Sequence, residues 1–332
     1  MQKTLLFLGL LGCLSPFGLQ AQQDPMLTQF TFNNLLFNPA CAGTSDHLAM
    51  SVTHRQQWLG LDGAPVGQSL SIHSPLANNR IALGGTLTHD KIGPSETFDL
   101  STAYAYRFPV GAHMQLSAGL QASLANWHGD WFDILLEDGI DGVFQHNQSR
   151  WLPNVGVGLF LYGDRFYAGI SSPRIVEHDL RRAAGGDYAF YAKTYRHYYT
   201  TVGATFPLAD NGRVQIKPAL LLKSTGWFSS FRRDETFQNI GSPTELDLDC
   251  SVFFNQTLRV GASWRTAVEM KRSSASSANV WAMYYLLNGL RFGAAYDLTL
   301  SQLRQAATNS LEIVVGYEFD IKVKKVSSPR YF

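Results

Sequence analysis

Few residues in this chain have the types and spacing that catalysis or metal binding needs. The histidines are scattered, and His54 and His73, on neighbouring predicted strands, alternate onto opposite faces, which argues against a shared metal. Outside the N-terminal leader, Cys41 and Cys250 do not form a Cys-x-x-Cys pair. Serine, histidine and acidic residues are numerous enough for a chance triad, but no motif marks a hydrolase. The sequence therefore predicts no enzyme activity, no cofactor and no metal.

Charged side chains with regular spacing do occur near residue 250. Three carboxylates alternate with apolar residues on one predicted strand, and two arginines share the same face of the next strand: Glu245, Asp247, Asp249, Arg259 and Arg265. An acid–base ladder between the two strands is one interpretation. The other is that these side chains line a wet lumen and neutralise one another.

The alternation that places these charges is the strongest signal in the chain. Between residues 114 and 124 the even positions are apolar and the odd positions are small or polar. Because successive side chains of a strand point to opposite faces, one face of such a segment suits lipid and the other suits water. The same alternation recurs from Leu48 to Ile321, with turn-forming residues between the segments. This pattern is typical of a transmembrane β-barrel.

Composition agrees with a membrane barrel and argues against two other classes, a helical membrane protein and a nucleic-acid-binding protein. Charged residues make up 16% of the chain, against about 25% in globular proteins. No stretch after Leu14 approaches the roughly 18 apolar residues of a transmembrane helix, whereas a closed barrel satisfies its backbone hydrogen bonds in hydrocarbon. The net charge of +1 offers no attraction to nucleic acid, so we expect lipid rather than nucleic acid as a partner.

The predicted fold is all-β: a closed antiparallel transmembrane β-barrel of about 14 strands, an even number as bacterial barrels require. The barrel covers residues 47–321, and a C-terminal tail follows at 322–332. The expected strands are 47–57, 67–74, 80–90, 97–108, 113–125, 151–162, 165–171, 195–206, 213–223, 245–255, 258–268, 279–287, 290–298 and 309–321.

The connections alternate between short turns and mostly longer loops, which places the short turns and both termini in the periplasm. Two of the longest loops, 126–150 and 172–194, are rich in aromatic residues, among them Trp127, Trp131, Phe132 and Tyr188. Exposed aromatic side chains suit binding, so we expect these extracellular loops to contact a protein partner. The alternative is that they fold over the mouth of the barrel.

Residues 1–21 have the features of a secretory signal peptide, with Lys3, an apolar core at Leu5–Leu14 and the small residue Ala21 before the predicted cleavage site. A lipoprotein signal ending at Cys13 is the alternative, although it would shorten the apolar core. Either signal agrees with export and with an outer-membrane location.

Residues 22–46, between the signal peptide and the first strand, do not alternate. Phe30, Phe32, Leu36 and Phe37 make this segment too apolar for a free periplasmic tail, so we expect it to pack in the lumen or against a partner. Glycines fall on the inward phase of several strands, where they would let an internal segment approach the wall.

The same N-terminal segment carries motifs of a known family. Its Asp24-Pro25, Gln29-Phe30, Phe32-Asn33 and Asn38–Gly43, together with His54–Trp58, Ser71–Leu76 and the ending Ser328–Phe332, resemble the PorP/SprF family of type IX secretion membrane proteins. Cys41 stands where the family usually has a tyrosine.

The resemblance implies an outer-membrane component of the Bacteroidota secretion and gliding machinery. It implies a non-enzymatic role: helping to export, or to anchor at the cell surface, a secreted adhesin-like protein through that protein's C-terminal domain. Periplasmic ring components of the apparatus are further implied partners. The alternative function is a porin or small-molecule transport channel, because the bore of a 14-stranded barrel is undecided from strand number alone.

Overall fold

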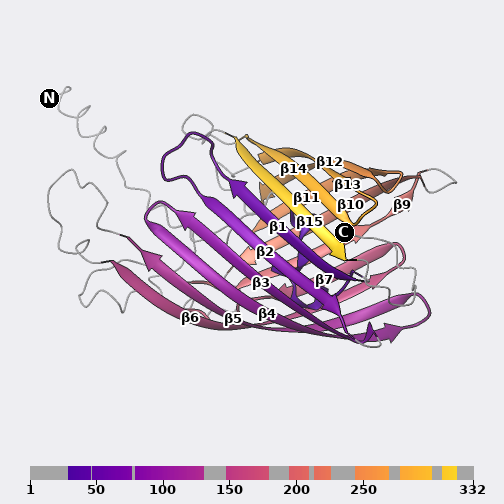
Figure 1. Cartoon of the computed structure of the whole chain (residues 1–332), viewed down its shortest axis with the longest axis horizontal. Coiled ribbons are helices and arrows are strands. Elements are labelled where there is room, and N and C mark those ends of the chain that lie inside the picture. The colour runs from indigo at the N-terminus through magenta and orange to yellow at the C-terminus, as the bar shows by residue number, and fades with distance from the viewer. Residues whose placement is uncertain are drawn as a thin grey trace, which may run out of the picture.

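The computed structural model is one antiparallel β-sheet closed into a barrel (Figure 1). It describes residues 29–45, 47–76, 79–130, 147–178, 194–208, 213–225, 244–268, 277–300 and 309–319. The strands are β1 (Leu48–Gln56), β2 (Val66–Pro75), β3 (Ile81–Ile92), β4 (Ser95–Val110), β5 (Met114–Gly129), β6 (Gln148–Gly163), β7 (Phe166–Ser172), β8 (His197–Ala204), β9 (Phe206–Pro207), β10 (Val214–Thr225), β11 (Glu245–Phe254), β12 (Leu258–Ala267), β13 (Ser277–Tyr285), β14 (Leu290–Thr299) and β15 (Ser310–Phe319).

Apart from β8 and β9, which both pair with β10, each strand pairs with its neighbours in sequence, and the last strand closes the barrel against the first. In that closing pair Leu48 lies opposite Phe319 and Gln56 opposite Leu311. Strands β8 and β9 pair with β10 in one continuous register, on either side of a break at Thr205. Together they count as one strand of the barrel that is interrupted at that residue. The described strands therefore form a closed 14-strand barrel, which confirms the predicted fold class.

Strand boundaries agree with the predicted ones to within a few residues, and the largest differences lie at one hairpin. Strand β5 continues to Gly129 and β6 begins at Gln148, so Trp127 is paired with Arg150 inside the sheet. The sequence reading that placed Trp127 in a loop is wrong. Polar residues such as Asn126 had obscured the alternation at the end of that strand.

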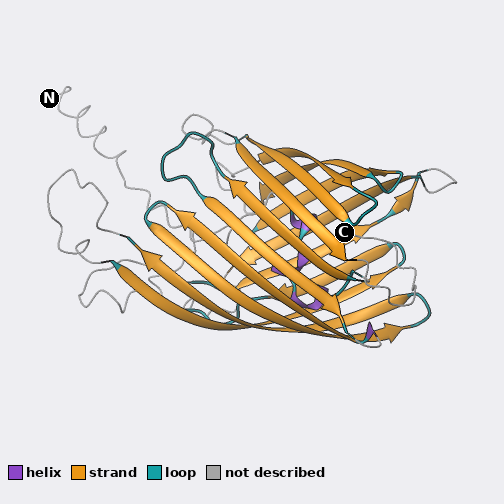
Figure 2. Cartoon of the chain, in the orientation of Figure 1, coloured by secondary structure: helices purple, strands orange, loops and turns teal. Residues whose placement is uncertain are grey.

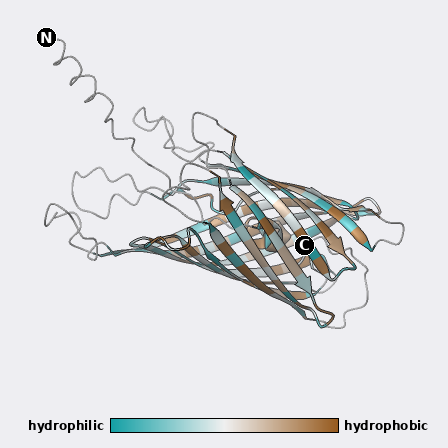
Figure 3. Cartoon of the chain, turned by 90° about the horizontal axis from the view of Figure 1, so that it is seen from above, coloured by the Kyte–Doolittle hydropathy of each residue, from teal (hydrophilic) through white to brown (hydrophobic). Residues whose placement is uncertain are grey.

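The two faces of the wall differ as the alternation predicts. Large apolar side chains stay exposed on the outside, as at Leu100, Leu120 and Ile313, while the inward neighbours on the same strands are buried. Hydropathy accordingly changes from residue to residue along the strands (Figure 3). Cys250 lies on the outer face and is exposed. The outer face is therefore an apolar band suited to lipid.

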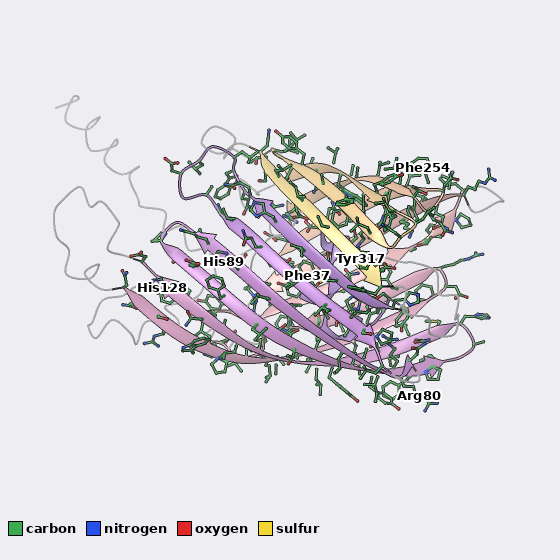
Figure 4. All side chains as sticks on the ribbon, in the orientation of Figure 1. Phe37, Arg80, His89, His128, Phe254 and Tyr317 are labelled. Atoms are coloured by element: carbon green, nitrogen blue, oxygen red, sulfur yellow. The ribbon has the colours of Figure 1, made fainter. Side chains whose placement is uncertain are left out.

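The barrel has two unlike ends. At one end, which we call the short-turn mouth, strands are joined by tight turns such as 111–113 and 255–257, and this end also holds Leu48 and Phe319. At the other end, the long-loop mouth, the connections are longer, except for the tight turn at 93–94. In Figure 4, Arg80 and Phe254 mark the short-turn mouth, and His89 and His128 lie toward the long-loop mouth.

The interior of the barrel contains a segment that belongs to no strand. Three short 3-10 helices, η1 (Phe30–Phe32), η2 (Asn34–Leu36) and η3 (Pro39–Cys41), lie inside the wall ahead of β1 (Figure 2). We call residues Gln29–Thr44 the plug.

The outer apolar band gives a first prediction. Leu120→Arg puts a charge on a side chain that is 61% exposed on the outside of β5. A charge on the lipid face costs about 2–4 kcal/mol near the bilayer midplane, so this variant should unfold at a lower urea concentration in lipid vesicles. Leu120→Ala, which adds no charge, is the control. Equal unfolding midpoints for the two variants would show that this face does not meet lipid.

Candidate functional site: the occupied lumen

The plug folds as a series of tight turns because its sequence supplies the caps. Asn38 precedes η3, and its side-chain Oδ1 accepts a hydrogen bond from the N–H of Ala40 at 2.9 Å. Pro39, at the first helical position, has no N–H to leave unsatisfied there. Gly43, with φ of +66°, then turns the chain out toward β1. The turns keep the plug compact enough to fit across a lumen.

Apolar side chains of the plug pack against all sides of the wall. Phe32 meets Trp281 edge-to-face, with 4.9 Å between the ring centroids. The other contacts form three buried clusters: Phe30 and Phe37 with Tyr199 and Leu221; Leu35 and Ala42 with Ala82, Ala103 and Ala105; Ala40 and Cys41 with Phe160, Tyr162 and Tyr167. Burying one large apolar side chain stabilises by roughly 1.5–3 kcal/mol, so this packing favours a fixed plug.

Hydrogen bonds fix the two ends of the plug to different strands. At its start, the side chain of Gln29 donates to Asn279 Oδ1 at 2.8 Å and to Ser263 Oγ at 3.1 Å, and its backbone N–H donates to Glu312. At its end, the Gly43 N–H donates to His73 Nδ1 at 3.0 Å, and Arg107 donates to the carbonyl oxygens of Ala42 and Gly43.

Hydrogen bonds also hold the middle of the plug. The Asn38 amide donates to the Leu159 carbonyl at 3.0 Å, and Ser171 Oγ donates to the Phe37 carbonyl at 2.7 Å. The first bond satisfies the side-chain amide of Asn38, and the second satisfies a plug carbonyl that would otherwise be buried without a partner. Phe37 accordingly lies well inside the barrel (Figure 4).

Glycines in the wall make room for the plug backbone. A Cβ atom at Gly119 would overlap the backbone of Pro39 and Ala40, and one at Gly158 would overlap the Asn38 side chain. At Gly84 the added atom would lie 3.0 Å from Leu35 Cδ2. The wall of β3, β5 and β6 is therefore shaped to the plug. These three inward glycines therefore let the internal segment approach the wall, as predicted, whereas Gly203, Gly261 and Gly316 instead make room for the wall side chains Tyr167, Trp281 and Arg291.

The charged residues singled out in the sequence gather on the opposite side of the lumen. Arg265 Nε lies 2.6 Å from Asp247 Oδ1, and both side chains are buried. Asp249 accepts from Trp281 Nε1 at 2.7 Å, whereas Arg259 donates to Ser251 Oγ and lies over the Trp281 ring. The five residues thus share one wall, but they contact aromatic and hydroxyl groups as well as each other.

A second buried ion group lies beside the start of the plug. Arg55 lies 3.2 Å from Asp297 and 3.6 Å from Glu312, the residue that also receives the Gln29 N–H. None of these residues was a sequence candidate. A single charge on the inward phase of a barrel strand is a weak signal, because a wet lumen would accept it equally well.

The remaining candidates divide by where they fall. Phe30, Phe32 and Phe37 are buried in the plug, and Leu36 is partly buried. Trp131, Phe132 and Tyr188 lie outside the described residues, so the partner-binding role of those loops stays a prediction.

The described residues also bear on the possible metal and thiol chemistry. Among them, no group of three or more metal-ligating side chains lies together. Cys41 is a free thiol, buried in the cluster with Phe160 and Tyr162. It is a packing group at a position where the family usually has a tyrosine.

The fold and the occupied lumen define a plugged membrane barrel of the outer-membrane type. The model of the type IX secretion system membrane protein PorP/SprF family matches residues 19–317, and the chain belongs to this family. No curated protein matches the chain.

Solved structures similar to the chain are also barrels. A Pseudomonas aeruginosa FadL homologue is 14% identical over 91% of this chain and 96% of its own, with a TM-score of 0.48. The CymD monoaromatic hydrocarbon channel is 11% identical over 89% and 94%, with a TM-score of 0.47. Outer membrane protein Omp33 of Acinetobacter baumannii is 10% identical over 82% and 99%, with a TM-score of 0.42. Likenesses this distant carry no argument about function.

The fit between wall and plug can be tested with one methyl group. Gly119→Ala should destabilise the protein by about 1–3 kcal/mol, the usual cost of overpacking. Gly85→Ala is the matched control, because its added Cβ would lie an ordinary 3.6 Å from the nearest atom. In a variant lacking residues 24–43, Gly119→Ala should have no effect on the urea midpoint. An equal effect with and without the plug would contradict the fit.

The buried pair of Arg265 and Asp247 gives another prediction. Asp247→Asn leaves the buried guanidinium with a weaker partner and should cost about 3–5 kcal/mol, while the double variant Asp247→Leu/Arg265→Met should cost less. The measurement is again the unfolding midpoint in vesicles, with Asp62→Asn in an exposed loop as control. If the double variant were the less stable of the two, the pair would be a net source of stability.

Proposed function

We propose that the chain is a non-enzymatic component of the type IX secretion and gliding machinery that helps to export a cognate adhesin-like protein or to hold it at the cell surface. Membership of the PorP/SprF family supports the secretion role. The observation that carries the holding role is the plug, which crosses the lumen and packs against the wall on all sides. A barrel filled in this way suits an anchor better than an open pore.

The proposed orientation puts the short-turn mouth in the periplasm and the long-loop mouth outside, as in other bacterial barrels. The long loops then form the surface that meets the C-terminal domain of the secreted partner. Periplasmic ring components of the apparatus would meet the short-turn mouth, where Gly43 and Arg107 lie.

A transport channel is the competing function, and the plug is the feature that separates the two. Phe30 is 2% exposed and Ala40 and Ala42 are not exposed at all, so the plug leaves no gap around these residues. A planar-bilayer measurement on the full-length protein should therefore show little steady conductance. Steady porin-like conductance would favour the channel.

Deleting residues 24–43 while keeping the signal peptide tests the anchoring role. The barrel should still insert, because its closing hydrogen bonds lie between strands. We expect it to lose display of its adhesin and to gain conductance. The partner is first identified by mass spectrometry of proteins that co-purify with the full-length barrel, and display is then measured on intact cells with an antibody to that partner.

Milder variants control for the large deletion. Phe30→Glu and Phe32→Glu should reduce display in the same direction, because a buried carboxylate disfavours the packed plug. Phe30→Leu and Phe32→Leu, which stay apolar, should keep most of the display. Normal display by a stably inserted deletion variant would refute the role of the plug.

A further inference from the structure

The plug has a direction within the barrel. Its first described residue, Gln29, contacts Asn279 and Glu312. Each of these lies two residues from the long-loop end of its strand, at Ser277 of β13 and Ser310 of β15. Gln29 therefore lies close to the long-loop mouth.

The last part of the plug lies at the opposite mouth. Gly43 contacts His73, two residues from the short-turn end of β2 at Pro75, and Arg107, three residues from the end of β4 at Val110. The chain then enters β1 at Leu48, also at the short-turn mouth. Residues 29–48 thus cross the lumen from the long-loop mouth to the short-turn mouth.

Distances decide which mouth is open to the residues before Gln29. From the level of Asn279 the long-loop rim is two residues away, about 7 Å along the strand, while the short-turn end at Tyr285 is six residues away, about 20 Å. Seven residues from the predicted cleavage site reach about 24 Å when fully extended. Length alone would barely permit a return to the short-turn mouth.

The return path is also filled. Phe32 packs into the cluster of Trp281, Met283 and Tyr285 on β13, and this cluster lies between Gln29 and the short-turn end of that strand. Met283 and Tyr285 are both buried. A second pass of chain along this wall would have to displace these contacts, whereas the route to the long-loop rim is short.

We propose that the chain threads its own barrel, so that the mature N-terminus leaves through the long-loop mouth, opposite the end of β15. This differs from the expectation that both termini lie in the periplasm. Only the statement that this mouth faces the cell surface rests on the proposed function. The surface would then carry a free chain end beside the long loops, directly connected to Gln29 and the plug.

Cysteine labelling on intact cells tests the threading. The background carries Cys41→Ala and Cys250→Ser, so that it has no native thiol in the mature chain. In it, Asp24→Cys reports on the N-terminus. The two controls are Asp62→Cys, in the exposed β1–β2 loop at the long-loop mouth, and Ala112→Cys, in the exposed β4–β5 turn at the short-turn mouth. A membrane-impermeant maleimide should label the first two on intact cells and the third only after the outer membrane is permeabilised. Mass spectrometry of the mature N-terminus checks processing, and heat-modifiability on gels checks folding. If Asp24→Cys folds poorly, Gln23→Cys replaces it.

The outcome for Asp24→Cys relative to the two controls decides the proposal. If it labels only when Ala112→Cys does, or resists labelling in both conditions, threading is wrong. If Asp62→Cys and Ala112→Cys exchange behaviour while Asp24→Cys still follows Asp62→Cys, threading holds. In that case the proposed orientation of the barrel is the part that fails.

Discussion

The whole structure depends on closing one sheet so that no backbone polar group meets hydrocarbon unpaired. Pairing of β15 with β1 and of β10 with β11 removes both edges. Backbone groups stay paired even where β7 stops, at Ser172. Beyond it, the N–H of Ile175 donates to the Val155 carbonyl. The Asn154 side chain then donates to the Val176 carbonyl and accepts from the Val176 N–H. A side-chain amide there replaces a missing ladder partner.

Closure at this strand number leaves an interior that the wall's own side chains do not fill, which is why the plug and the wall residues match. On one side the wall supplies glycine and alanine, and the plug backbone comes close, as at Gly119 and Ala82. On the other side the wall supplies long charged side chains that reach inward and pair, such as Arg265 with Asp247. Small residues and paired charges are two ways to fit one lumen without leaving cavities or isolated charges.

The barrel could be predicted almost completely from the sequence, because lipid on one face and a lumen on the other impose an alternation that is local in the chain. The burial of Phe30 and Phe32 also followed from local apolarity. The sequence did not reveal which residues contact one another inside the barrel. Gln29 donates a hydrogen bond to Asn279, for example. Arg259 lies over the Trp281 ring and donates to Ser251. Those contacts join the plug to a strand, or one strand to another, and an alternation that is local in the chain does not specify them.

The plug is held unevenly along its length. From Asn38 to Gly43 it is wedged against glycines and bonded by Arg107, so its removal would strip a close-fitting backbone from its wall. In its first half, the amide of Asn34 and the hydroxyl of Thr31 are buried with no hydrogen bond among the described residues. A buried polar group left without any partner costs about 1–3 kcal/mol, so these two residues do not help the wall to hold this half of the plug. Arg55, beside this half, would keep its pair with Asp297 if the half withdrew, whereas Glu312 would lose the N–H of Gln29. The part of the plug before Asn38 is therefore held less firmly than the part from Asn38 to Gly43, and it is the part nearer the long-loop mouth.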